Sequence, residues 1–107
     1  MALIEIDLEL HKDITNGTED ITQNTIPPTG EFYITDIYGE AAIDLNCYVA
    51  IKFDGVLIWH TKGSSSSDKQ RKFTGDGVKK VELVLSAVDL TTGSVLLGGS
   101  CKVRYKT

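Results

Sequence analysis

Residues 43–61, IDLNCYVAIKFDGVLIWHT, contain the pattern that decides the fold. Up to Phe53 every second residue of this stretch is apolar, which is the period of a strand with one face in a core. Asp54-Gly55 follows, and then the β-prone run Val56–Thr61. Asp-Gly between two such runs favours a two-residue type I′ turn, because both turn positions need positive φ. The stretch therefore predicts a β-hairpin.

Similar patterns on either side of the hairpin predict further strands. Residues 3–11 and 94–106 alternate apolar with polar or charged side chains, and residues 78–90 are apolar on both faces, as in a central strand. Thr91-Thr92-Gly93 predicts a turn that joins 78–90 to 94–106 in a second hairpin. Because no segment has helical periodicity, we expect an all-β, antiparallel β-sandwich of about seven strands, immunoglobulin-like or jelly-roll.

Three features interrupt this strand pattern within the single domain expected for residues 1–107. Residues 12–31 are polar and broken by Asn-Gly and Pro-Pro, so they predict a long loop or arm, or a loop with a short edge strand near Ile21. Residues 62–71 include four consecutive serines and predict a flexible polar loop. Gly98-Gly99, in the middle of the last strand, predicts a bulge or a close backbone approach.

The charge of the chain divides sharply between its halves. All 107 residues carry 11 Lys and Arg against 15 Asp and Glu, a formal net charge of −4. Residues 1–54 hold two basic and eleven acidic side chains, whereas residues 55–107 hold nine basic and four acidic ones. The net acidity and the lack of a nucleic-acid motif argue against a nucleic-acid partner. With no signal peptide and no apolar run of membrane-spanning length, we expect cytoplasmic synthesis and no membrane partner.

Residues that carry catalytic or metal chemistry are few and scattered. His11 and His60 are the only histidines, and no CxxC spacing, nucleophile elbow or phosphate-binding loop is present. We therefore expect no enzyme activity, no cofactor and no metal site, although loop aspartates leave calcium open.

Cys47, Trp59 and Cys101 follow the Cys-Trp-Cys order of antibody domains. The hairpin register points Trp59 away from Cys47, so buried thiols are expected instead.

The same hairpin register predicts a candidate binding patch. Tyr48, Lys52, Leu57 and Trp59 share the face opposite the strongly alternating one. This face is either covered by the long loop or exposed as an aromatic and aliphatic contact surface. If it is exposed, Trp59 and Tyr48 could anchor a protein partner or stack on a sugar ring.

The first and last strands carry opposite charges at the same two-residue spacing. The acidic set is Glu5, Asp7 and Glu9, and the basic set is Lys102, Arg104 and Lys106. If the strands are neighbours in one sheet, these side chains form cross-strand pairs within a molecule. If they are not, the acidic edge of one molecule can meet the basic edge of another, head to tail.

Residues 81–96, VELVLSAVDLTTGSVL, form a strand-TTG-strand pattern that is the nearest local match to a known class. With the serine-rich loop and the long arm, the chain resembles in architecture the small β-sandwich accessory proteins of tailed-phage virions. The resemblance implies a non-enzymatic capsid-decoration or tail subunit, located on the virion, whose partners are other virion proteins or copies of itself. A carbohydrate-binding module that stacks a glycan on its aromatic patch is the alternative, and an intracellular adaptor also fits this size.

Overall fold

Two very long strands organise the fold, which a computed structural model describes for residues 2–41 and 47–107. Ile43 and Leu45, which the sequence places on an inward face, lie outside the described residues. The strands within the described ranges are β1 (Leu3–Thr25), β2 (Gly30–Ala41), β3 (Cys47–Phe53), β4 (Val56–Thr61), β5 (Gly63–Ser67), β6 (Arg71–Gly75) and β7 (Val81–Lys106).

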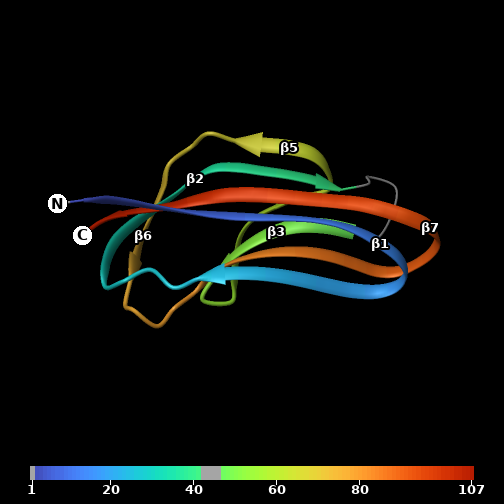
Figure 1. The fold of residues 1–107 in the computed structure, drawn as a ribbon, viewed down its shortest axis with the longest axis horizontal. Coiled ribbons are helices and arrows are strands. Elements are labelled where there is room, and N and C mark those ends of the chain that lie inside the picture. The colour runs from blue at the N-terminus through green and yellow to red at the C-terminus, as the bar shows by residue number, and fades with distance from the viewer. Residues whose placement is uncertain (1, 42–46) are drawn as a thin grey trace.

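β1 and β7 pair antiparallel along their whole length, from Leu3 opposite Lys106 to Thr25 opposite Val81. The register shifts on either side of Gly17, and in this region the two-stranded ribbon folds back on itself (Figure 1). Each long strand therefore belongs to two sheets. Residues 3–15 pair with the C-terminal half of β7 in one sheet, and the remainder of β1 pairs with its N-terminal half in the other.

The two sheets have the strand order of a jelly roll. Sheet I runs from the first half of β1 through the second half of β7 to β2, which pairs with β5 at one end and β6 at the other. Sheet II runs from the second half of β1 through the first half of β7 to β3 and β4. The fold is thus an all-β antiparallel sandwich, as the sequence predicts, and this order matches the jelly roll rather than the immunoglobulin arrangement.

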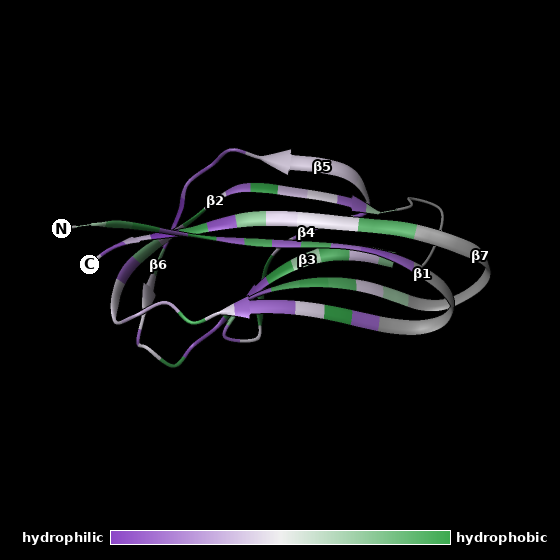
Figure 2. Cartoon of the chain, in the orientation of Figure 1, coloured by the Kyte–Doolittle hydropathy of each residue, from purple (hydrophilic) through white to green (hydrophobic). Residues whose placement is uncertain are grey.

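The core lies between the two sheets and follows the alternation seen in the sequence. Val49 and Ile51 of β3 and Leu83 of β7 face Ile34 and Val103 of sheet I, and all five are fully buried. Figure 2 shows that β3 and the neighbouring half of β7 are the most hydrophobic parts of the sandwich. Burial of this apolar surface is the main force that holds the sheets together.

Aromatic rings join the sheets at the end where the chain termini lie (Figure 1). Phe32 and Phe73 of sheet I stack with ring centroids 5.6 Å apart, and Phe53 of sheet II lies 5.1 Å from Phe32 and 5.4 Å from Phe73. These separations are typical of stabilising aromatic pairs. The backbone N–H of Thr107 donates to the carbonyl of Ala2 at 2.9 Å, so the termini are joined.

The predicted hairpin and the predicted close approach at paired glycines are both confirmed. Asp54 and Gly55 turn the chain between β3 and β4 with φ of 53° and 77°, as a type I′ turn requires. A Cβ added to Gly99 would lie 2.7 Å from Val49 Cγ1, so this residue must lack a side chain for the sheets to pack.

Two polar segments predicted as loops are strands over much of their length. Residues 12–25 continue β1, and Gly63–Ser67 is β5, which pairs with Ile37 to Ala41 of β2. The predictions of a long loop or arm at 12–31 and a flexible loop at 62–71 are wrong over these residues, whereas the alternative of an edge strand near Ile21 is confirmed, because Ile21 lies in β1 at the sheet edge. Each segment lies at a sheet edge and takes its backbone hydrogen bonds from one neighbour, so it needs few apolar side chains.

The predicted hairpin around Thr91-Thr92-Gly93 is also wrong. The segments 78–90 and 94–106 do not pair with each other, because β7 runs on through this region and both of its halves pair with β1. Turn-forming residues mark the position where the ribbon bends. They carry no information about which strand will be the hydrogen-bonding partner.

Candidate functional site

The acidic first strand and the basic last strand meet within one molecule. Glu5 lies opposite Arg104 and Asp7 lies opposite Lys102. The remaining predicted residues are offset, since Glu9 lies opposite Ser100 and Lys106 lies opposite Leu3. The alternative in which these two strands meet only between molecules is therefore wrong, because the ladder between β1 and β7 brings them together within one molecule.

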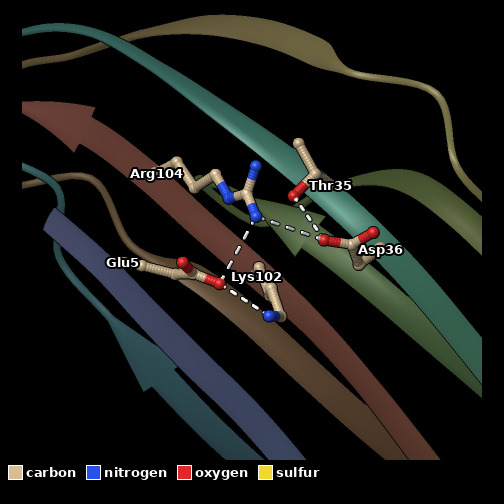
Figure 3. Close-up of polar contacts among 5 residues, drawn as sticks. All are labelled: Glu5, Thr35, Asp36, Lys102 and Arg104. Carbon is tan, nitrogen blue, oxygen red and sulfur yellow. Dashed lines mark hydrogen bonds and ion pairs between the residues drawn. The ribbon is translucent and has the colours of Figure 1, made fainter. Parts of the chain in front are cut away.

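The charges form a network on the outer face of sheet I (Figure 3). Glu5 Oε1 lies 2.6 Å from Lys102 Nζ and 3.5 Å from Arg104 Nη2, and Arg104 Nη2 lies 3.7 Å from Asp36 Oδ2. The hydrogen bond from Lys102 lowers the pKa of Glu5, and the same bond raises the pKa of Lys102. Each pKa shift favours the charged form, so the network stays ionised around neutral pH.

A β-bulge in β2 positions the second carboxylate of this network. Between Thr35 and Tyr38 the strand has one residue more than the facing part of β7, and Asp36 adopts a φ of 52°. A bulge redirects side chains, and aspartate tolerates this left-handed conformation better than most residues. Thr35 Oγ1 donates to Asp36 Oδ2 at 3.2 Å, so the carboxylate is fixed beside Arg104.

A cleft of about 620 Å³ lies next to this network on the outer face of sheet I, and we call it the outer cleft. Ile34 and Val103 face the core, so the adjacent residues of β2 and β7 point outward into the cleft. Leu3 and Tyr105 form apolar parts of its wall. The polar lining residues are Glu31, Tyr33, Thr35, Gln70, Arg104 and Lys106.

Sequence analysis found only Arg104 and Lys106 among these lining residues. The alternation from Glu31 to Thr35 was the available signal, because it places polar side chains opposite Phe32 and Ile34. Alternation shows which side chains share a face of the strand, but it does not show which strands pair with it. Pairing of β2 with both β7 and β6 is what places Tyr33 beside Arg104 and Gln70.

The patch predicted on the β3–β4 hairpin does not form as one surface. The register shifts by one residue between Ile51 and Lys52, so Trp59 lies opposite Ile51 on the core-facing side. Its ring packs toward Gly39 of sheet I, with Cη2 3.0 Å from where a Cβ would be. The predicted placement of Trp59 is wrong, because one bulge residue inverts the faces beyond it.

The other members of that patch stay on the outer side. Lys52 and Leu57 are paired across the hairpin, and Tyr48 precedes them on the same face of β3. Tyr48 and Lys52 are half-buried, and Leu57 is exposed. The stacking platform of Tyr48 and Trp59 is therefore not assembled.

Four exposed apolar side chains lie on segments that meet at the end of sheet II where the β3–β4 turn lies. Ile26 follows the last residue of β1, which pairs with the first residue of β7. The start of β7 lies in turn beside the β3–β4 turn, where the N–H of Asp54 donates to the carbonyl of Lys80 at 3.0 Å. We call these exposed side chains the end patch: Ile26, Val56, Leu57 and Val78.

The most exposed residue of the end patch lies on an ordered turn. Val78 is 77% exposed, and its backbone N–H and that of Lys79 donate to Asp76 Oδ1 at 2.9 and 2.8 Å. These bonds lower the pKa of Asp76, with the bond from Lys79 as the larger cause. The turn therefore holds an apolar side chain in solvent, where it makes no contribution to the core.

The described part of the chain shows no group of three or more His, Cys, Asp or Glu side chains that could hold a metal ion. Cys47 and Cys101 are both buried thiols, as expected. Burial raises the pKa of Cys101 to about 12, so this thiol is not a nucleophile at neutral pH.

No helix in the described ranges is both long and apolar enough to cross a membrane.

No family model matches the chain, and no curated protein matches it in sequence.

Proposed function

We propose that the protein is a non-enzymatic structural subunit of a phage virion, on the capsid or the tail. It acts through surface contacts with other virion proteins or with copies of itself. The end patch is the observation that carries this proposal. Large apolar side chains that stay exposed in one region of a protein usually mark protein contacts.

The geometry of the end patch suits a docking surface. Val56 and Val78 are 64% and 77% exposed, and both belong to tight turns, so little conformational entropy is lost when a partner covers them. Lys79 and Lys80 are exposed next to the patch and supply a polar rim. An apolar centre with a charged rim is the usual anatomy of a protein interface.

The strand order gives weaker support. Jelly rolls occur in viral capsid domains and also in lectins, so the fold agrees with a virion role but does not define one. β1 pairs with β7 alone among the described strands, which leaves its other edge as a second contact surface.

The test uses particles purified from a lysate of the strain that encodes the chain. We expect mass spectrometry to find the chain in intact particles, and the tagged protein to co-sediment with particles that lack it. Val78→Ser should weaken this binding about tenfold or more, because a fully buried valine contributes roughly 1.5–3 kcal/mol.

Leu96→Ser is the matched control, because Leu96 is 59% exposed and lies in β7 far from the end patch. It should bind as well as the wild type. Absence of the chain from purified particles, or equal binding of the wild type and Val78→Ser, would contradict the proposal.

A further inference from the structure

The outer cleft is separate from the end patch and has the chemistry of a ligand site. Its volume of about 620 Å³ lies within the range of small-molecule sites, roughly 300–1,000 Å³. Tyr33 supplies aromatic surface, and the remaining lining residues include a carboxylate, an amide and two cationic groups. Donors and acceptors therefore both line a partly apolar hollow.

Arg104 is held in place before any ligand arrives. Both of its ion-pair contacts, with Glu5 and Asp36, use Nη2. Nε is buried and has no hydrogen-bond partner among the described residues. In Figure 3 the other terminal nitrogen points away from Glu5 and Lys102. A preorganised donor of this kind loses little entropy when it binds a ligand oxygen.

This arrangement contains features that lower the stability of the fold. A buried donor without a partner is unfavourable, and the left-handed Asp36 adds backbone strain to β2. Thr35 is 3% exposed, and its hydroxyl donates a hydrogen bond to the Asp36 carboxylate. Unfavourable features that converge on one guanidinium are typical of functional sites.

The charges around the outer cleft largely balance, so they give an acidic ligand no advantage over a neutral one. Two carboxylates already flank Arg104, and Glu31 stands on the cleft wall with only a 3.9 Å contact to Lys72. Lys102, Arg104 and Lys106 balance these three carboxylates, so a ligand carboxylate would meet little net charge. Hydroxyl groups both donate and accept, so a ligand with several hydroxyls can hydrogen-bond the carboxylate, the amide and the guanidinium of the lining.

From the fixed Arg104, the Tyr33 ring and the mixed donors and acceptors, we infer that the outer cleft binds a neutral saccharide. Tyr33 packs against the apolar face of the sugar, and Arg104, Glu31 and Gln70 hydrogen-bond its hydroxyls. This site differs from the platform of Tyr48 and Trp59 that the sequence suggested. The inference does not rest on the proposed virion role.

The test records amide spectra of the folded, ¹⁵N-labelled protein while saccharides are added. The probes are glucose, galactose, mannose and N-acetylglucosamine, each also as a disaccharide, with glucuronic acid as the charged comparison. We expect at least one neutral probe to shift the amides of Tyr33, Gln70 and Arg104 while those of Val56 and Val78 stay in place.

Variants then identify the contacts. Tyr33→Ala should weaken binding of the same probe at least tenfold, and Tyr48→Ala, which alters the opposite sheet, should bind like the wild type. If Tyr33→Ala does not fold, Glu31→Ala serves instead, because this side chain is 65% exposed, and it should weaken binding about threefold or more.

Three results would overturn the inference. The first is that no neutral probe shifts any cleft amide, and the second is that only glucuronic acid does so. The third is that folded Tyr33→Ala or Glu31→Ala binds as tightly as the wild type. None of these results bears on particle binding through the end patch, so the two proposals fail independently.

Discussion

Gly98 and Gly99 are adjacent in β7, but we predict opposite effects when each is replaced by alanine. A Cβ on Gly99 would lie 2.7 Å from Val49 Cγ1 and 3.2 Å from Leu83 Cδ1, both buried in the facing sheet. Overpacking of this kind costs about 1–3 kcal/mol. Alanine also returns roughly 0.4–1 kcal/mol by restricting the unfolded chain, since neither glycine has a positive φ. Gly99→Ala should therefore lower the free energy of unfolding by about 1–2 kcal/mol.

Gly98→Ala is the matched control. Its Cβ would lie 2.7 Å from His11 Nδ1, but the His11 side chain is 59% exposed and can swing into solvent. We expect this variant to be as stable as the wild type or about 0.5 kcal/mol more stable. Urea unfolding followed by Trp59 fluorescence measures both, with the m-value as a check on the two-state transition. A Gly99→Ala protein as stable as Gly98→Ala would refute the packing argument.

Two further predictions concern the polar network and the core thiol. The pKa of Glu5 is lowered in the folded state, so its contribution to stability is present above the ordinary glutamate pKa and is lost as the pH falls through the lowered value. The difference in free energy of unfolding between the wild type and Glu5→Gln should shrink between about pH 6 and about pH 3, and a constant difference would contradict this. Cys101 is buried with a pKa of about 12, so iodoacetamide at neutral pH should label it in denaturant but scarcely in the folded protein. Peptide mapping measures this, and equal labelling in both states would show that the thiol is accessible.

Sequence patterns predicted the local elements with a strong signal. The hairpin at Asp54-Gly55 formed because its turn chemistry and its alternation act over a few residues. The paired charges of Glu5 and Arg104 were visible as matched spacing on two strands. Their meeting within one molecule, which the sequence left open, follows from the ladder between β1 and β7.

The candidate sites depended on features that local patterns do not encode. A single bulge at Ile58 of β4 moved Trp59 to the core side, and a second bulge at Asp36 directed a carboxylate toward Arg104. Bulges add one residue to one strand only, so they arise from the fit between neighbouring strands. The outer cleft was missed for the same reason, because its walls come from β1, β2, β7 and the segment before β6.

The sequence by itself determined that this protein is an all-β sandwich, since period-two hydrophobicity and turn residues act locally and favour strands wherever they occur. Tertiary structure alone decided which strands pair, how the β1–β7 ribbon folds back to join both sheets, and which side chains meet in the outer cleft and the end patch. The physical reason is that backbone hydrogen bonds are the same for every residue. Strand partners are therefore chosen by how the whole set of apolar faces can be buried together.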